Sequence, residues 1–524
     1  MLYQLSHCPT GPGLGPGPAV NPLRQACPGA WRRLWSRSTK GPPYVSRWPG
    51  REPAPSRPAR SGRDAPARAD HGGARLALVT AQRSPRPLSD LAPDELDELL
   101  ASTREDYEAL RTKGLALDVT RGKPSAAQLD LSDALLRLPS TTTDRSGTDV
   151  RNYGGLAGLV EIREIFADLL GVDVPQLVAG GSSSLTLMRE CLVDLLLFGG
   201  VDSPRPWKDE ESVTFVCPVP GYDRHFALLE ELGISMVTVP MREDGPDAAA
   251  VAALVADDPG VKGMWLVPTY ANPTGAVCSQ EVAAELAAMP TAAPDFKIFW
   301  DNAYAVHHLG LDEAKSADVL GLAAASGHPH RPIMFASTSK ITYAGAGVAF
   351  LASSTEQVAW YLEHLGKGSI GPDKVNHLRH AELFGDAEGV RAHMREHAAI
   401  IAPKFAEVDR VLGERLGGLG IARWNSPTGG YFVSLDVVPG TASRVVELAK
   451  GVGVALTPAG ASFPYGRDPQ DENIRLAPTM PPLDEVREAM EVVATCVLLA
   501  AVEHATAGSG RHRPSGVAGQ GDQG

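Results

Sequence analysis

A lysine at the end of a strand-like run is the first residue of this sequence that could carry chemistry. Lys340 follows the apolar run PIMFASTS (332–339), and the segment after it is rich in Gly and Ala. A lysine that loses water in such surroundings has a lowered amine pKa, which is what an imine-forming amine requires. A solvated surface lysine is the alternative interpretation.

Two more polar residues follow a second apolar run, FKIFW (296–300). Asp301 comes directly after it, and Tyr304 lies three residues further on. A carboxylate placed after five mostly apolar residues is expected to be buried, and it then needs a cationic or hydrogen-bonding partner. The alternative is that Asp301 caps the next helix.

Two further segments have the composition of ligand-binding turns. Asn272 precedes a proline in Ala271–Gly275, so it is disfavoured in a helix, and its amide is expected in a turn at the strand ends. The segment Gly180–Ser184 (GGSSS) opens an amphipathic helix, whose free N–H groups and positive dipole end could bind a phosphate. The alternatives are a tight turn and an ordinary Ser-capped helix.

The elements that must position these residues form a repeating pattern between about residues 150 and 350. Helical periodicity alternates with the short apolar runs VTFVCPV, GMWLVPTY, FKIFWDNAY and PIMFASTS. This pattern predicts an α/β fold whose mainly parallel sheet is covered by helices on both faces and binds ligands at the carboxyl ends of its strands.

The flanking segments predict further helices and a second, smaller unit. Residues 84–114 predict a capped amphipathic helix that opens with Ser and Asp. A long helix over about 386–416, the strand-like run YFVSLDV, a helix near 443–450 and a closing helix from Leu483 predict a smaller α+β domain.

Taken in order along the chain, these motifs resemble the fold-type-I pyridoxal-phosphate enzymes, and in particular the class I aminotransferases. The segments DVTRGKPS, PGYDRHF, STSKITYAGAGVAF and NIRLAPT are similar to a bacterial aspartate-aminotransferase-like branch. The resemblance covers about residues 90–505. It implies an N-terminal arm and part of the small domain at 86–145, a large cofactor domain at 146–370 and a small C-terminal domain at 371–506.

The resemblance also assigns roles around a bound pyridoxal 5'-phosphate. Lys340 would hold the cofactor as an internal aldimine and then move the proton at the substrate α-carbon. Asp301 would pair with the pyridine nitrogen, which keeps the ring an electron sink. Tyr304 and Asn272 would hydrogen-bond the phenolic oxygen of the ring. Tyr222 would stack on the ring face, with His225 as the weaker candidate.

The remaining implied contacts concern the phosphate, the substrate and a second subunit. The phosphate would be held by Gly181, Ser182, Ser183 and Ser337. Arg475 would grip the substrate α-carboxylate with a bidentate fork, while Asn272 and Gly122 would also line the substrate site. Tyr153 matches a tyrosine that reaches the phosphate of the neighbouring subunit, which implies a homodimer with active sites at the interface.

One position departs from the family pattern. Gly347 stands where many members carry a phosphate-binding arginine, so the phosphate would lack that cation. Lys367 and Lys374 are candidates to replace it, although solvated loop lysines are the simpler interpretation. For the distal carboxylate of a substrate, Arg121 and Lys123 are candidates, although their segment could be only a special turn.

Composition excludes several other classes of protein. The 524 residues carry a net charge of −13, which argues against a nucleic-acid partner. No long uncharged apolar run is present, so no membrane span is expected. The six cysteines form no CxxC pair, which argues against a zinc site or disulfide framework and favours a reducing, cytoplasmic location. No metal is expected.

The two ends of the chain differ from the rest. Residues 1–75 hold twelve Lys and Arg against three acids and are dense in Pro and Gly, so residues 1–85 are expected to be disordered. A transit peptide and an over-long reading frame are alternatives for this extension. Residues 507–524 are expected to form a disordered tail.

These observations favour an aminotransferase that acts on an amino acid, aspartate or glutamate, and a 2-oxo acid such as 2-oxoglutarate. A lyase or decarboxylase would use the same cofactor and the same motifs, so it stays an alternative. A transcription regulator with an aminotransferase-like sensor domain is a third, but residues 1–85 offer no pair of amphipathic helices for DNA binding.

Overall fold

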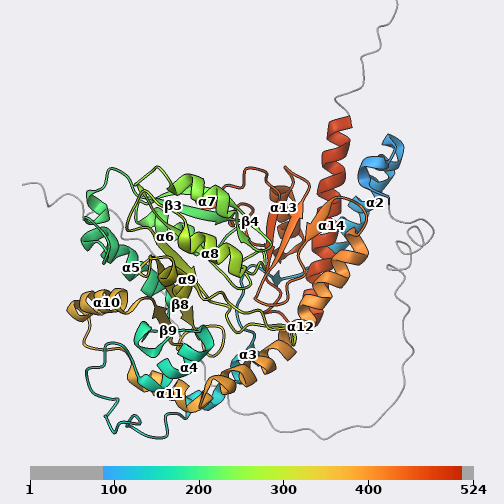
Figure 1. The fold of residues 1–524 in the computed structure, drawn as a ribbon. Helices are drawn as coiled ribbons and strands as arrows, with labels where there is room; N and C mark the ends of the chain where they lie inside the picture. Colours follow the sequence, from blue (N-terminus) through green and yellow to red (C-terminus); the bar gives the residue numbers. More distant parts are fainter. Residues whose placement is uncertain (1–85, 510–524) are drawn as a thin grey trace, which may run out of the picture. The chain divides into compact units, whose positions relative to one another are not determined.

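The computed structural model describes residues 86–509 (Figure 1). The predictions for residues 1–85 and for most of the C-terminal tail therefore lie outside the described residues. The closing helix runs through Ser509, three residues into the segment predicted as tail.

A mixed, mainly parallel sheet forms the centre of the fold. Its strand order is β2-β9-β8-β7-β6-β3-β4-β5, and the five adjacent strands β8, β7, β6, β3 and β4 run parallel to one another. Strand β9 is antiparallel to β8 and β2, and β5 is antiparallel to β4. The strands are β2 (Leu177–Ala179), β3 (Thr214–Val219), β4 (Ser235–Arg242), β5 (Gly245–Pro246), β6 (Val261–Leu266), β7 (Lys297–Asp301), β8 (Pro332–Ser337) and β9 (Ala349–Ala352).

Helices cover both faces of this sheet, as the sequence predicts. Side chains alternate along each strand, so Phe299 of β7 packs into one core while Ile298 and Trp300 pack into the other. One face is covered by α5 (Ser184–Phe198), α6 (Asp223–Glu231) and α10 (Thr355–Gly368). The other is covered by α4 (Val160–Leu170), α7 (Ala248–Val255), α8 (Gln280–Ala288), α9 (Val319–Ala325) and α11 (Lys374–Phe384).

A second core lies around a three-stranded antiparallel sheet of order β10-β11-β13. Its strands are β10 (Ala422–Trp424), β11 (Val433–Val437) and β13 (Asn473–Leu476). The helices that pack there are α2 (Pro93–Arg111), α12 (Ala387–Leu416), α13 (Ala442–Val452) and α14 (Leu483–Ser509). The smaller α+β unit is therefore present, although its predicted boundaries stay a prediction.

The N-terminal arm reaches this second core. Strand β1 (Leu117–Asp118) pairs in parallel with β12 (Val454–Ala455), and the short helix α3 (Ala126–Asp130) follows it. The predicted helix over 84–114 is α2, but its N-cap is Ala92 rather than a Ser or Asp. The Glu95 side chain accepts a hydrogen bond from the Ala92 N–H at 2.9 Å, and Pro93 occupies the first helical position.

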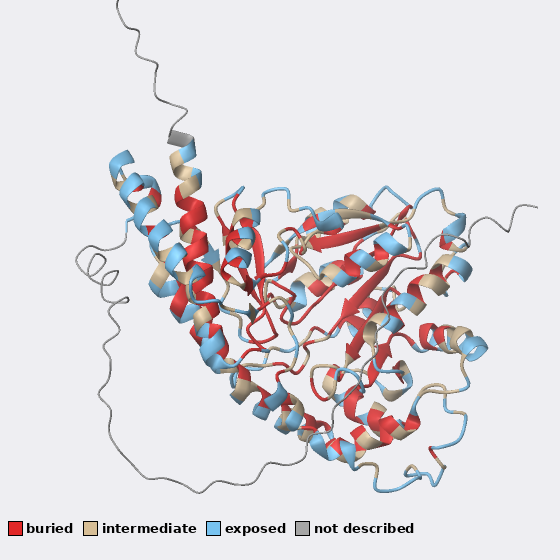
Figure 2. Ribbon diagram, turned by 180° about the vertical axis from the view of Figure 1, so that it is seen from behind, coloured by how far each residue is buried: buried red, intermediate tan, exposed pale blue. Residues whose placement is uncertain are grey.

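The long helix α14 is a core element. Among the described residues it is the one helix with the length and hydropathy of a membrane span, over Leu483–Ala507. Its apolar 18-residue stretch is 72% buried inside the fold. Figures 1 and 2 show it running beside α2 and α12, with buried residues along most of its length. Its apolar character is explained by burial between helices.

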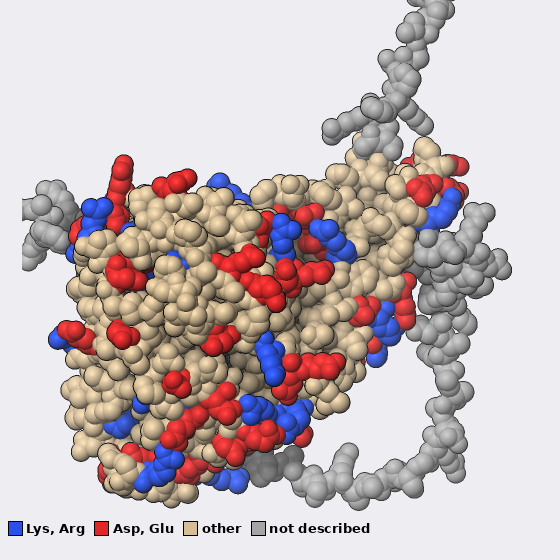
Figure 3. All heavy atoms as spheres, in the orientation of Figure 1, with Lys and Arg blue, Asp and Glu red and all other residues tan. Residues whose placement is uncertain are grey.

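Acidic side chains are the more widespread charged groups on the face shown in Figure 3. There Asp and Glu side chains are interspersed with Lys and Arg over the described part of the surface. Such a face lacks the broad basic footprint of a nucleic-acid-binding surface.

Candidate active site

Lys340 lies just beyond the carboxyl end of β8, between two aromatic rings. Its Nζ is 4.8 Å from the ring centroid of Tyr304 and 5.9 Å from that of Tyr431. The Tyr431 hydroxyl donates a hydrogen bond to the Lys340 carbonyl oxygen at 3.3 Å. The lysine side chain is half-buried at this strand end.

Asp301 ends the neighbouring strand β7 and is 3% exposed. Its Oδ2 accepts a hydrogen bond from the Nε2–H of His225 at 2.9 Å, while its Oδ1 is buried and has no hydrogen-bond partner. A turn rather than a helix follows Asp301, so the helix-capping interpretation is wrong. The predicted need for a partner is met by His225, which leaves one carboxylate oxygen uncommitted.

His225 is held from behind by a tryptophan. The imidazole ring stacks on Trp265 with the centroids 4.1 Å apart and the planes 7° from parallel. This stacking fixes the ring orientation and aims Nε2 at Asp301. The sequence predicts His225 as a cofactor stacker and gives no role to Trp265, although the segments PGYDRHF and GMWLVPTY contain the two residues.

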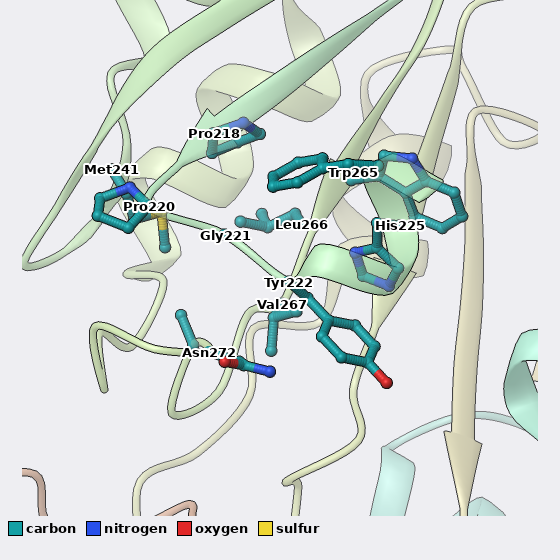
Figure 4. Close-up of a pocket in the computed structure, with 12 residues that line it drawn as sticks. Pro218, Pro220, Gly221, Tyr222, His225, Met241, Trp265, Leu266, Val267 and Asn272 are labelled. Atoms are coloured by element: carbon teal, nitrogen blue, oxygen red, sulfur yellow. The ribbon is translucent and has the colours of Figure 1, made fainter. Parts of the chain in front are cut away.

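Tyr222 and Tyr304 are phenols in a desolvated environment. Burial raises the pKa of Tyr222 to about 12, and burial together with the Asp301 charge raises the pKa of Tyr304 further. Both hydroxyls therefore keep their protons and can donate hydrogen bonds. Figure 4 shows the Tyr222 ring beside His225. The amide end of Asn272 points toward the Tyr222 ring in the same pocket.

Arg475 approaches the same region from β13. The arginine is 7% exposed, and its guanidinium carbon lies 5.0 Å from the ring centroid of Phe432. Its Nη1 donates to Asp223 Oδ1 at 2.8 Å and to Asn272 Oδ1 at 3.4 Å, whereas its Nε is buried and has no partner. Arg475 is therefore a buried cation beside Asn272 and not a solvated residue at the surface of its strand.

Gly122 is positioned by a close approach to the same phenylalanine. A Cβ at this position would lie 2.6 Å from Cζ of Phe432, which is closer than real Cβ contacts allow. The glycine therefore lets the N-terminal arm pass over the aromatic ring that lies against Arg475. The flanking Arg121 and Lys123 are exposed.

The predicted phosphate cradle forms the N-terminus of α5. Ser183 is the N-cap residue, as the Ser-capped-helix interpretation expects, but its side chain makes no capping hydrogen bond. Gly181 and Ser182 are exposed, and Ser339, two residues after Ser337, donates from its Oγ to the Ser182 carbonyl at 3.2 Å. This contact ties the α5 N-terminus to the segment that carries Lys340.

Gly347 is packed where a larger side chain would collide. A Cβ there would lie 2.9 Å from Thr338 Oγ1, which accepts the backbone N–H of Val348 at 2.9 Å. An arginine at this position would have to displace Thr338. The glycine is thus part of the local packing of this chain.

Tyr153 and Lys374 lie in adjoining segments but in opposite environments. Tyr153 is 81% exposed. Lys374 is 5% exposed, and its Nζ donates to the carbonyl oxygens of Asn152 and Gly154, each at 2.6 Å. The interpretation of Lys374 as a solvated loop lysine is therefore wrong, whereas Lys367 is exposed at the end of α10.

The chain is similar in sequence to known proteins. A family model described as aspartate amino-transferase matches residues 91–509. A protein of Mycolicibacterium smegmatis named as an aminotransferase is 58% identical over 414 residues, which make up 78% of this chain and 97% of the relative.

Solved structures give the same result. An aspartate transaminase from Corynebacterium glutamicum is 54% identical, with a TM-score of 0.79 and coverage of 80% of this chain and all of that one. The alpha-aminoadipate aminotransferase of Thermus thermophilus, solved with N-(5'-phosphopyridoxyl)-L-leucine, shares the fold at 20% identity and a TM-score of 0.60, covering 74% of this chain and 93% of that one. Neither the lyase or decarboxylase alternative nor the regulator is favoured by these relatives.

Proposed function

The chain belongs to the aspartate aminotransferase family, the class I pyridoxal-phosphate enzymes of fold type I, and from that premise we propose that it transfers an amino group between aspartate or glutamate and a 2-oxo acid such as 2-oxoglutarate. The observation that carries the proposal is the half-satisfied Asp301 carboxylate, which lies in the same site as Lys340, Tyr304 and Arg475.

The residues present fit pyridoxal phosphate on their own chemistry. The partnerless, buried Asp301 Oδ1 is an acceptor for a protonated ring nitrogen, and burying a lone carboxylate oxygen is costly without such a donor. The N-terminus of α5, with Gly181, Ser182 and Ser183, would bind the phosphate, together with Ser337. Tyr222 would cover the ring face.

The bound cofactor would supply an electron sink for the bond that breaks at the substrate α-carbon. Lys340 would hold the cofactor through its amine and afterwards accept the α-carbon proton at Nζ. Tyr304 and Asn272 would donate hydrogen bonds to the ring oxygen. The raised pKa of Tyr304 supports this role, because the phenol stays protonated at neutral pH.

Substrate binding would use the guanidinium of Arg475, which is only partly paired within the chain. Its Nε has no partner and its Nη1 is held by a single oxygen of Asp223, so a substrate carboxylate could pair with the guanidinium in a bidentate fork. Asn272, which already contacts Arg475, would hold the same carboxylate from the other side. Gly122 would bring the N-terminal arm close enough to shield the site from water.

The assembly and location are part of the proposal. An exposed tyrosine on a loop fixed by a buried lysine is what a contact to a second copy needs, because the residue is presented without being free to turn inward. We therefore propose a cytoplasmic homodimer in which Tyr153 reaches the phosphate of the neighbouring subunit.

Half-reaction spectra of the holoenzyme test the function. Single amino acids are added without a 2-oxo acid, and the visible cofactor absorbance is followed. Aspartate and glutamate are expected to convert the cofactor, and 2-oxoglutarate is expected to restore it. Release of carbon dioxide would contradict the proposal. Conversion of the cofactor only by other amino acids, and not by aspartate or glutamate, would contradict it as well.

A further inference from the structure

The substrate-binding arginine already has a carboxylate partner within its own chain. Asp223 Oδ1 lies 2.8 Å from Arg475 Nη1, and the two residues are 252 positions apart in the sequence. Asp223 is the first residue of α6, directly after Tyr222. An acid is thus built into the site at the place where an anionic substrate is expected to bind.

The pair uses only part of the guanidinium. Asp223 contacts Nη1 through one oxygen, Asn272 shares the same nitrogen at 3.4 Å, and Nε stays unpaired. A one-point pair of this kind is weaker than the two parallel hydrogen bonds of a bidentate carboxylate. A substrate carboxylate that forms two parallel hydrogen bonds with the guanidinium could therefore replace Asp223, which forms only one.

The two members of the pair differ in burial. The Arg475 side chain is 7% exposed, so its charge needs a partner when no substrate is present. The Asp223 side chain is 35% exposed and lies at a helix N-terminus, where solvent and the helix dipole both stabilise a released carboxylate. Asp223 can therefore leave the pair, whereas Arg475 cannot.

We propose that Asp223 is a specificity-determining residue that occupies Arg475 in the free enzyme and is displaced by the substrate carboxylate. The inference rests on the proposed function, since it takes Arg475 as the carboxylate site. Asp223 makes every incoming anion compete with a resident one, so only ligands that form the two-point pair bind well. Single-contact anions are rejected.

The test is calorimetric titration of the holoenzyme with succinate, a dicarboxylate that has no amino group to react. In Asp223→Asn the amide keeps a hydrogen bond to Arg475 but removes the competing charge. Succinate is expected to bind about tenfold more tightly than to the parent enzyme, and Asp223→Ser, a second variant in case the first is unstable, should change in the same direction.

Glu230→Gln is the matched control, because it removes the same charge from an exposed position of α6. Its affinity for succinate should stay within about twofold of the parent. Unchanged or weaker binding by Asp223→Asn would overturn the inference and make Asp223 a fixed support for Arg475. Parent-like succinate binding by Arg475→Ala would instead show that the carboxylate site itself is misplaced, which is a failure of the proposed function.

Discussion

Replacing Asp301 by Asn tests the electrostatics of the site without changing its shape. The variant keeps a carbonyl oxygen that can accept the His225 Nε2–H, but it puts an NH2 group at the position of the partnerless Oδ1. An amide nitrogen cannot accept a hydrogen bond from a protonated pyridine. The variant therefore removes the charge that would keep the cofactor ring protonated.

The size of the effect follows from burial. An opposite charge at contact distance shifts a pKa by about 1–3 units, and each unit is worth about 1.4 kcal/mol. Because Asp301 is 3% exposed, water screens the interaction poorly, and we take the upper part of that range, about 3 kcal/mol. The expected loss of rate is on the order of a hundredfold, with cofactor binding retained.

The assay is single-turnover reaction of the holoenzyme with saturating aspartate, followed by the cofactor absorbance. Asp318→Asn is the matched control, since Asp318 caps α9 by accepting the Gly321 N–H at 2.9 Å. Asparagine caps about as well as aspartate, so the control should react at the parent rate. A rate for Asp301→Asn within about threefold of the parent would refute the reasoning, because the acid would then have only a structural role.

Three further changes test the packing around the site. Lys374→Met removes two hydrogen bonds that hold the Tyr153 loop, so it should lower the free energy of unfolding by about 2–4 kcal/mol and weaken dimerisation measured by sedimentation. Lys367 is exposed, so Lys367→Met should change neither quantity. Equal effects of the two substitutions would contradict the assignment. Gly347→Ala should cost about 1–3 kcal/mol in thermal unfolding, because its Cβ meets Thr338 Oγ1 at 2.9 Å, and an unchanged melting temperature would be inconsistent with this packing. Burial lowers the pKa of His377 to about 4, so an unfolded chain binds the proton that the folded one refuses as pH falls from 6.5 toward 4. The free energy of unfolding measured in urea should therefore be about 2 kcal/mol lower at pH 5 than at pH 7 because of this group. His377→Gln should show a smaller decrease. An identical pH dependence in the variant would exclude this histidine as the source.

The local patterns predicted the fold well because each depends on neighbours in the chain. The four apolar runs are β3, β6, β7 and β8, and the long helix predicted at 386–416 is α12, which Asp386 caps. Periodicity and turn chemistry are properties of a few consecutive residues, so they are visible without a structure. The positions of Lys340 and Asp301 at adjacent strand ends follow from the same reasoning.

The partners of the site residues could not be predicted, because they come from distant parts of the chain. His225 and Asp301 are 76 residues apart, and Lys374 reaches carbonyls more than 200 residues earlier. Nothing near Lys374 in the sequence distinguishes a buried lysine from a solvated one, since its hydrogen-bond acceptors are backbone carbonyls. The same holds for Asp223, whose pairing with Arg475 leaves no local signature.

The helix start at α2 shows a different limit. Ser and Asp side chains precede the helix, yet Ala92 is the N-cap. Its backbone N–H donates to the carboxylate of Glu95 at the third helical position. Pro93 favours the first helical position, so it fixes the helix start after residue 92 regardless of the better capping residues upstream. Competing local signals of this kind are decided by backbone geometry.

The most direct test of the central claim is to locate the attached cofactor. The holoenzyme is treated with borohydride, which fixes a lysine-bound pyridoxal phosphate irreversibly, and is then digested and analysed by mass spectrometry. The account predicts the phosphopyridoxyl mass on the peptide that contains Lys340, and its loss in Lys340→Ala together with turnover. Attachment to another lysine, or a Lys340→Ala enzyme that keeps both the visible absorbance and turnover, would contradict it.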